Sequence, residues 1–404
     1  MLSKLLPAIF FLSAIAVQAQ YKNDNVSFKT VDWTNLCNVL QNNKGYLLLD
    51  VRSPGEYGDT SQYASLNIGH LKGAENISVQ QLSNRLSEID SYKNKPVFVY
   101  CSHSQRSRRA SKMLSDSGFT NVYNINGGMT AAYYTNAKDK DCLQSLIVTT
   151  DKYNVISAAD ICKKLSANPG NVFLLDVRSD SAFRHISTNA QENAYGIIKG
   201  STNIPLAELE SKLSTIPRNK EIIVTDLSGG DAAKAATLLK EKGFEKVSTL
   251  IEGIDRWLSE NSDACENLYV SPVSYRIMNS TAFVNAVRGN KDGLVLDIRG
   301  ADEFANKHKD TWRNVGHIKN AINIPGTELS QRLSEISAYK NKPIFLYDFS
   351  GSTALFESAN LLAQQGFTNI NLLVNGLFDI RWAAANLNQP SLKDIITDVP
   401  DYNL

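Results

Sequence analysis

One six-residue pattern occurs three times in this chain of 404 residues, and the repetition constrains the fold more than any other feature of the sequence. Each copy is a short apolar run followed by an aspartate, an apolar residue and an arginine. The copies occupy residues 47–52, 173–178 and 294–299, about 120 residues apart. A unit of this length is large enough to be a domain with its own hydrophobic core. The chain is therefore predicted to consist of three tandem domains of one fold.

A second repeated pattern allows the domain boundaries to be placed. It begins with a glycine at Gly69, Gly196 and Gly316, and each copy is followed by an Asn-Ile pair. The predicted ranges are 26–146 for domain 1, 151–267 for domain 2, 272–386 for domain 3 and 387–404 for a C-terminal tail. Because the tail is mostly polar and contains two prolines, we expect it to be loosely packed and without a functional signal.

Within domain 1, short apolar runs alternate with amphipathic stretches. Residues 46–51, 97–100 and 122–125 are apolar over the length of a strand, as is typical of strands buried on both faces of a parallel sheet. Residues 79–89 and 107–117 have the pattern of helices. This alternation predicts an α/β fold, a mostly parallel central sheet flanked by helices, with ligands bound beyond the carboxyl ends of the strands.

The N-terminal residues have the composition of a secretory signal peptide. Lys4 precedes an apolar run over residues 5–17, and Ala19 stands where cleavage is expected, so residues 1–19 are predicted to be removed on export to the periplasm or the exterior. A membrane anchor is the alternative, but the run is shorter than the roughly 20 residues that span a bilayer. No later stretch is long and apolar enough, so no membrane span is expected after cleavage.

The charge balance excludes some classes of partner. Lys plus Arg number 42 and Asp plus Glu number 41, so no net field attracts nucleic acid, and any bound anion must be held by a local arrangement. The histidines and cysteines lack the spacing of zinc ligands. We therefore expect no nucleic-acid partner, no metal and no organic cofactor, and the oligomeric state stays open.

One loop of domain 1 carries reactive chemistry. Cys101 stands between the end of the predicted strand 97–100 and the start of a helix, where unpaired backbone N–H groups and the helix dipole favour a thiolate. The same N–H groups can cradle an anion, and Arg106 adds a planar cation suited to oxyanions. The other loop residues are candidate substrate contacts; they are Ser102, His103, Ser104, Gln105 and Ser107.

The three units resemble rhodanese domains, and the resemblance covers the expected mature chain apart from short termini. In that family the cysteine of a Cys-x4-Arg loop takes the outer sulfur of a donor such as thiosulfate, becomes a persulfide, and passes the sulfur to a thiophilic or thiol acceptor. Cys101 and Arg106 match this motif, and Ser107 matches a hydroxyl residue that often follows it. Ser104 departs from a common glycine. The resemblance thus implies a thiosulfate sulfurtransferase with Cys101 as nucleophile.

Other functions remain open for the same loop. Related phosphatases of this fold have five residues between Cys and Arg, whereas four intervene here, which favours sulfur chemistry. A redox enzyme would use the same thiolate for disulfide exchange. A non-turnover sulfur carrier or binding module would receive sulfur from a partner protein and show negligible turnover with small donors.

The corresponding loops of the other two domains lack this chemistry. Domain 2 has Asp226 in place of the cysteine and Asp231 in place of the arginine, and domain 3 has Asp348 and Thr353. A carboxylate cannot carry sulfane sulfur and repels an anionic donor, so domains 2 and 3 are predicted to be non-catalytic.

The repeated aspartate and arginine are kept in the domains that lack a nucleophile. This favours a role in holding the fold for Asp50 and also for His70, which has a counterpart at His317. Arg52 follows a strand that is expected to end near the pocket, so a substrate-binding role remains open for it.

The remaining four cysteines occur as one pair in domain 1 and one pair in domain 2, and both positions lack a cysteine in domain 3. Cys37 and Cys162 precede the repeated aspartate in domains 1 and 2, Cys142 and Cys265 end those domains, and domain 3 lacks both positions. In an oxidising compartment this predicts the disulfides Cys37–Cys142 and Cys162–Cys265, with Cys101 left as a free thiol. The alternative is that all four are small buried apolar residues.

Overall fold

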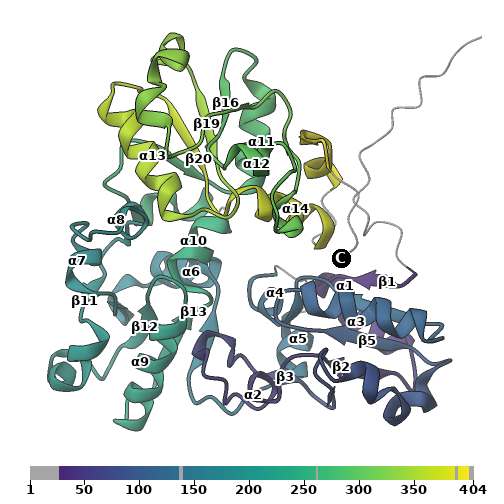
Figure 1. The fold of residues 1–404 in the computed structure, drawn as a ribbon. Coiled ribbons are helices and arrows are strands. Elements are labelled where there is room, and N and C mark those ends of the chain that lie inside the picture. The colour runs from purple at the N-terminus through teal and green to yellow at the C-terminus, as the bar shows by residue number, and fades with distance from the viewer. Residues whose placement is uncertain (1–26, 136–139, 261–262, 387–389, 400–404) are drawn as a thin grey trace, which may run out of the picture.

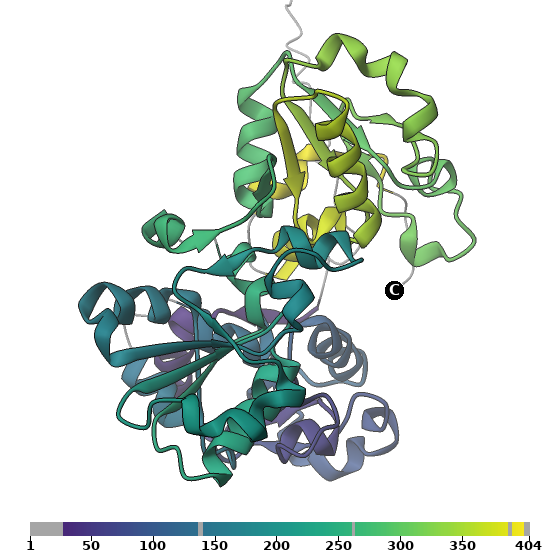
Figure 2. The ribbon, with the colours of Figure 1, turned by 90° about the vertical axis from the view of Figure 1, so that its left-hand side faces the viewer.

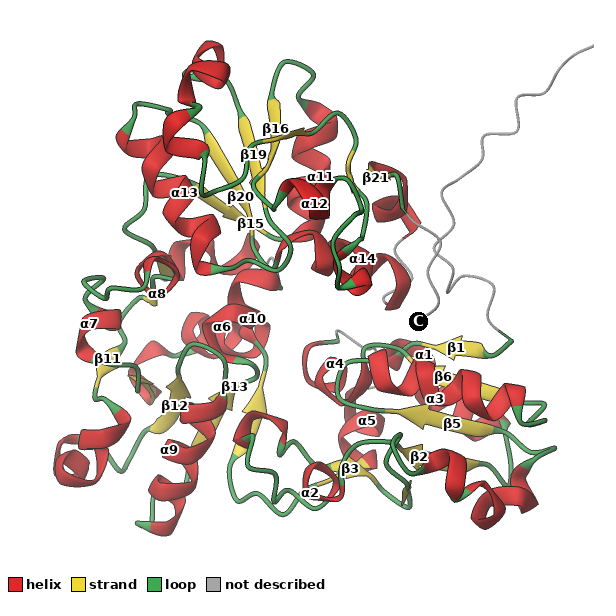
Figure 3. Cartoon of the chain, viewed as in Figure 1, coloured by secondary structure: helices red, strands yellow, loops and turns green. Residues whose placement is uncertain are grey.

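A computed structural model describes residues 27–135, 140–260, 263–386 and 390–399 of the chain. The predicted signal peptide, residues 1–19, lies outside the described residues. Three α/β units are visible, each with strands enclosed by helices (Figures 1 and 3). Within the described ranges, no helix combines the length and apolarity that crossing a membrane requires.

The sheet of domain 1 has the strand order β1-β6-β5-β2-β4, and every neighbouring pair is parallel. Its strands are β1 (Lys29–Val31), β2 (Leu47–Asp50), β4 (Glu75–Asn76), β5 (Val97–Tyr100) and β6 (Val122–Ile125). Its helices are α1 (Trp33–Asn42), α2 (Pro54–Tyr57), α3 (Gln105–Asp116), α4 (Gly128–Tyr134) and α5 (Lys140–Leu146). β2 and β5 are buried throughout, as their continuous apolar runs predicted.

The helix expected over residues 79–89 is instead two 3₁₀ segments, η3 (Leu82–Asn84) and η4 (Leu86–Tyr92). Serine and asparagine, which occur in this stretch, are weak formers of α-helix because their side chains can hydrogen-bond to the backbone instead. The apolar residues Leu82 and Ile89 are nevertheless fully buried against the sheet. The prediction of one α-helix over residues 79–89 was therefore wrong.

Domains 2 and 3 repeat this sheet with the same order and direction of strands. The strands of domain 2 are β8 (Asn154–Ile156), β9 (Val172–Asp176), β11 (Thr202–Asn203), β12 (Glu221–Thr225) and β13 (Val247–Leu250). Those of domain 3 are β15 (Arg276–Met278), β16 (Leu294–Asp297), β18 (Ile322–Asn323), β19 (Ile344–Tyr347) and β20 (Ile370–Leu373). The helices are α6 (Ala158–Ala167), α7 (Asp180–Phe183), α8 (Ala190–Ala194), α9 (Gly230–Glu241), α10 (Gly253–Ser259), α11 (Ser280–Gly289), α12 (Ala301–Phe304), α13 (Thr353–Gln364) and α14 (Gly376–Asn386).

A two-stranded antiparallel ladder closes each unit just beyond its predicted end. The pairs are β3 (His70–Leu71) with β7 (Ile147–Val148), β10 (Ile197–Ile198) with β14 (Tyr269–Val270), and β17 (His317–Ile318) with β21 (Ile396–Thr397). The repeated glycines lie beside this ladder. A Cβ at Gly69 would overlap the carbonyl oxygen of Val148, and Gly316 meets Thr397 in the same way. Close backbone approach therefore explains the repeated glycine.

The C-terminal tail is packed, contrary to our expectation for residues 390–399. The 3₁₀ helix η11 (Pro390–Ile395) leads into β21, and Leu392, Ile395 and Ile396 are buried in the core of domain 3. This segment supplies the third copy of the closing strand. Its short apolar pattern within a polar stretch was too weak a signal without that pairing partner.

The repeated aspartate and arginine form a buried ion pair in every domain. In domain 1 the Arg52 guanidinium binds the Asp50 carboxylate at 2.7 Å and donates to the Gly69 carbonyl at 2.7 Å. Arg178 and Arg299 make the same two contacts in domains 2 and 3. Arg52 is 0% exposed, so the pair ties β2 to the closing ladder from inside the fold.

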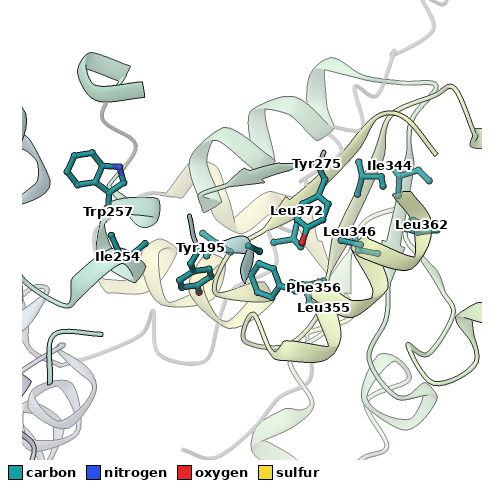
Figure 4. Packing of buried hydrophobic residues seen from close by; sticks show 14 of the residues in the cluster. Tyr195, Ile254, Trp257, Tyr275, Ile344, Leu346, Leu355, Phe356, Leu362 and Leu372 are labelled. Carbon is teal, nitrogen blue, oxygen red and sulfur yellow. The ribbon is translucent and has the colours of Figure 1, made fainter. Parts of the chain in front are cut away.

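The three domains pack directly against one another. One apolar cluster extends from domain 2 into domain 3, where the ring of Tyr195 meets that of Phe356 edge to face at 5.5 Å (Figure 4). The contact brings α8 of domain 2 against α13 of domain 3, as the view turned by 90° also shows (Figure 2). On the other side, η2 (Ala64–Leu66) of domain 1 lies against α9 of domain 2.

Candidate active site

The Cys101 loop connects the end of β5 to the start of α3, as predicted. Cys101 is a free thiol and is only 1% exposed. The loop is held by the first turn of α4, because the Met129 N–H donates to the Cys101 carbonyl at 2.8 Å and the Thr130 N–H to the Ser102 carbonyl at 3.1 Å. Gly128 fits here because a Cβ would overlap the backbone of Ser102.

The middle of the loop has a left-handed backbone at Ser104, with φ of +72°. The matching residues of the other domains are Gly229 at +90° and Gly351 at +76°. A residue with a Cβ is strained there by roughly 1–2 kcal/mol, which explains why glycine is the usual choice. The Ser104 Oγ donates to the Ile125 carbonyl at 3.3 Å, and this contact helps to hold the conformation.

Arg106 is held in place by a carboxylate that the sequence analysis missed. Its two terminal nitrogens bind the two oxygens of Glu56 at 2.7 and 2.6 Å, and Nη2 also donates to the Ser102 Oγ at 2.8 Å. Hydrogen bonds to Glu56 chiefly raise the pKa of Arg106, and the nearby Cys101 adds to this effect. Burial would raise the pKa of Glu56, but hydrogen bonds from Arg106 and from Ser53 outweigh it and lower that pKa.

A signal for Glu56 was present in the repeats. It stands four residues after Arg52, and domain 2 has Ala182 at that place and has also lost the arginine of the loop. Domain 3 keeps Glu303 but has no arginine in the loop, and there Glu303 pairs with Arg313 from a neighbouring segment. Because domain 2 lacks both the glutamate and the arginine, their joint absence could have indicated that Glu56 and Arg106 interact.

The third residue of the loop, His103, contacts both other domains. Its Nε2 contacts the Glu252 carboxylate of domain 2, and its carbonyl accepts a hydrogen bond from the Trp382 Nε1 of domain 3 at 2.9 Å. Its Nδ1 shares a hydrogen bond of 2.9 Å with the Ser102 Oγ. Sequence reasoning missed Glu252 and Trp382 because neither belongs to a motif of domain 1.

A cavity of about 200 Å³ lies beside His103, where all three domains meet. Its lining is mostly polar and consists of Ser65, Leu66, His103, Ser228, Glu252, Asp255, Arg256, Ser259 and Asn375. Cys101 is not part of this lining. The loop therefore has a polar space on its outer side and its sulfur on its inner side.

The other candidate residues fall into separate places. Ser107 is buried under the loop and donates to the Asn124 Oδ1 at 2.6 Å, so it supports the loop together with Ser104. Gln105 is exposed at the first position of α3. Arg52 lies in the interior on Asp50, which is an arrangement also found in the domains without a nucleophile. The structure therefore supports a fold-holding role for Arg52 and not the substrate-binding role that we left open.

A known protein family matches most of the chain. The protein-family model described as Rhodanese-like domain matches residues 36–133, 158–260 and 282–383, which together exceed half of the chain. The chain belongs to this family. The match confirms three tandem rhodanese-like domains, each with a parallel sheet flanked by helices.

Individual relatives of this rhodanese-like chain match parts of it. An uncharacterized protein of Bacillus subtilis, YqhL, is 42% identical over 81 residues, which are 20% of this chain and 56% of that protein. The thiosulfate sulfurtransferase GlpE of Shewanella oneidensis is 34% identical over 73 residues, 18% of this chain and 70% of that protein. The chain spans a little over half the length of the first of these relatives.

A solved structure of a thiosulfate sulfurtransferase from Pseudomonas aeruginosa also matches. It aligns with 86% of this chain and 66% of its own length, at 16% identity and a TM-score of 0.23. At this score the superposition adds nothing to the family match.

In the rhodanese-like domains 2 and 3, an aspartate carboxylate lies inside the loop. Asp226 accepts hydrogen bonds from the N–H groups of Gly229 at 2.5 Å and Asp231 at 2.8 Å. Asp348 accepts from Gly351 at 2.6 Å and Ser352 at 2.8 Å. Burial raises the pKa of both aspartates, although these N–H groups act against it. Each loop thus holds an acidic side chain at the position that Cys101 occupies in domain 1.

The four remaining cysteines are brought together in the predicted pairs. Cys37 on α1 and Cys142 on α5 form a disulfide with Cα atoms 6.4 Å apart, and Cys162 and Cys265 form a second with Cα atoms 5.8 Å apart. Both separations lie within the usual range for disulfides. Cys101 is thus left as the free cysteine.

Proposed function

We propose that this protein is a sulfurtransferase that moves sulfane sulfur from a thiosulfate-like donor to a thiophilic or thiol acceptor through Cys101. The observation that carries the proposal is a free cysteine in a Cys-x4-Arg loop whose backbone N–H groups, unlike those of domains 2 and 3, hold no carboxylate from the same loop position. Membership of the rhodanese-like family and the similarity to thiosulfate sulfurtransferases support it.

The reaction consists of two sulfur transfers. In the first, the Cys101 thiolate attacks the outer sulfur of thiosulfate; a new S–S bond forms, the S–S bond of the donor breaks, and sulfite leaves with the electron pair. In the second, cyanide or an acceptor thiolate attacks the terminal sulfur of the persulfide, and the Cys101 thiolate is regenerated. The loop N–H groups and Arg106 stabilise the departing anion.

The surroundings of Cys101 favour a small donor. Because the residue is 1% exposed, a slender terminal sulfur is a better match than a bulky phosphate ester. Arg106 is oriented by Glu56, and the nearby Cys101 contributes to raising the pKa of Arg106. The restricted access to Cys101 supports sulfur transfer over phosphatase chemistry, whereas Arg106 suits the oxyanions of either reaction.

We further propose that the protein is exported to the periplasm or the exterior after removal of residues 1–19. The two disulfides support this, because such bonds persist in oxidising compartments. The intact mass of protein recovered outside the cytoplasm tests both points. A chain that retains residues 1–19, or four reactive thiols besides Cys101, would contradict the proposal.

Thiosulfate-to-cyanide turnover of the purified protein tests the function. We expect thiocyanate formation, and incubation with thiosulfate alone should increase the mass of the protein by one sulfur atom. Cys101→Ser should lose both. Persulfide formation without turnover would favour a sulfur carrier, and hydrolysis of an aryl phosphate in place of sulfur transfer would favour a phosphatase.

A further inference from the structure

The domains without a nucleophile hold the Cys101 loop at a single residue. Domain 2 contacts the His103 ring through Glu252, and domain 3 contacts the His103 carbonyl through Trp382. Glu252 lies between β13 and α10, and Trp382 lies on α14. Both ends of His103 are thus fixed by side chains from outside its own domain.

The carbonyl contact has a direct consequence for the neighbouring amide. In a trans peptide the carbonyl of His103 and the N–H of Ser104 lie in one plane and point in opposite directions. A hydrogen bond from Trp382 to the carbonyl therefore also fixes the direction of the Ser104 N–H. The matching N–H groups, those of Gly229 and Gly351, are among those that bind the carboxylate in domains 2 and 3. Ser104 therefore supplies the N–H at the anion-binding position of domain 1.

The side chain of Glu252 is itself rigidly placed. Arg256 binds its other oxygen through Nε at 2.7 Å, and the Arg256 guanidinium stacks on the Tyr134 ring of domain 1 at 4.4 Å. Burial would raise the pKa of Glu252, but Arg256 and His103 outweigh this and lower it to about 2. Glu252 is therefore a carboxylate at neutral pH.

Glu252 also occupies a backbone position that does not suit it. Its φ is +52°, and the matching residues are Gly127 at +75° and Asn375 at +63°. Glycine and asparagine tolerate this left-handed conformation, whereas glutamate is strained in it. A strained residue whose side chain reaches a reactive loop indicates a role for the side chain.

We propose that Glu252 and Trp382 are positioning residues for the Cys101 site, which hold His103 so that the Ser104 N–H faces the anion formed during sulfur transfer. This rests on the proposed function. It gives domains 2 and 3 a role in the reaction of domain 1, although neither carries a nucleophile of its own.

The test uses the full chain with Trp382→Phe and Glu252→Gln. Single-turnover persulfide formation should slow about 10-fold in Trp382→Phe, because a misdirected amide stabilises the anion less than an aligned one. Glu252→Gln should slow it about 3-fold, and this loss should disappear in a His103→Ala background, because the carboxylate acts through the ring. The KM for thiosulfate should change less than kcat.

Two matched controls carry the same substitutions elsewhere. Trp312→Phe changes a tryptophan of domain 3 that is 57% exposed, and Glu208→Gln changes an exposed glutamate of domain 2 that pairs with Lys212. Both should keep the original rate. All rates are expressed per Cys101 thiol that titrates in the folded protein, so that a loss of folded protein is not counted.

Two results would overturn the proposal. One is an unchanged rate of persulfide formation per titratable thiol in both Trp382→Phe and Glu252→Gln. The other is an equal fall of this rate in these two variants and in their controls. If the unsubstituted protein makes no persulfide, the proposed function fails by itself. The alkylation rate of Cys101 by iodoacetamide then still tests the positioning role: a change in Trp382→Phe supports it, and equal rates in Trp382→Phe and Trp312→Phe contradict it.

Discussion

The loop of domain 1 and the loops of domains 2 and 3 share a left-handed residue at the same place but differ in the side chain at their first position. All three have a left-handed residue in the middle, at Ser104, Gly229 and Gly351. In domains 2 and 3 the first residue of the loop is an aspartate, whose carboxyl group binds the loop N–H groups. In domain 1 the same place holds the Cys101 thiol. We propose that the side chain at this one position decides whether an external anion can bind to the loop N–H groups.

A second difference concerns the partner of the loop. Arg106 is held by Glu56 in domain 1, whereas domain 2 lacks both groups and domain 3 pairs Glu303 with Arg313. In domain 3 the helix that follows the loop is α13, and domain 2 covers it where Tyr195 contacts Phe356.

The largest effect should follow from giving domain 1 the residue of its neighbours. Cys101→Asp and Cys101→Ser should each reduce thiosulfate-to-cyanide turnover at least about 1,000-fold, because neither side chain can carry sulfane sulfur. Cys101→Asp should fold, because its carboxylate has the same amides to accept from as Asp226 has. Turnover that survives either substitution would contradict the assignment of Cys101.

Removing the aspartate carboxylate from the loop of domain 2 should chiefly lower the free energy of unfolding. Asp226→Ala removes the acceptor of buried N–H groups, and we expect domain 2 to lose about 2–4 kcal/mol. The matched change in domain 1, Cys101→Ala, should cost about 1 kcal/mol, because the thiol is a small buried group. Hydrogen exchange at Gly229 and Asp231 measures the first effect. Equal costs in the two domains would show that the carboxylate is not what stabilises the loop.

Removing the carboxylate behind Arg106 should have an intermediate effect. Glu56→Gln should lower kcat about 10-fold, because the guanidinium loses its bidentate partner. The pKa of Glu56 is lowered on folding, so its contribution to stability is full above the unfolded pKa of about 4.3 and is lost as the pH falls through the folded value. Urea unfolding should therefore separate the variant from the original protein at pH 7 and less at pH 3. A constant difference would contradict the ion pair.

The smallest effect should come from replacing Ser104 with the glycine that domains 2 and 3 have at the same position. Ser104→Gly relieves strain at φ of +72° but loses the bond to Ile125 and adds freedom to the unfolded chain, so stability should change by less than about 1 kcal/mol. Gly351→Ala should cost more, because its Cβ would lie 2.6 Å from the Asn375 nitrogen. Thermal unfolding compares the two, and a larger loss in Ser104→Gly would show that the serine is needed for the loop.

Much of this architecture follows from repetition and local pattern. The run 97–100 predicted β5, and paired gain of cysteines predicted both disulfides. The closing strand β21 was missed because a two-residue strand has no pattern of its own until β17 pairs with it. The 3₁₀ segments after residue 79 were read as one helix because both conformations bury the same apolar residues.

The sequence alone determined the number of domains, the family resemblance, and which of three loops carries a thiol, because these depend on residue identity at repeated positions. Only the tertiary structure decided that Glu56 orients Arg106 and that Glu252 and Trp382 hold His103. Those contacts join residues about 50 to 280 positions apart, and they arise from how the chain packs, which no local pattern encodes.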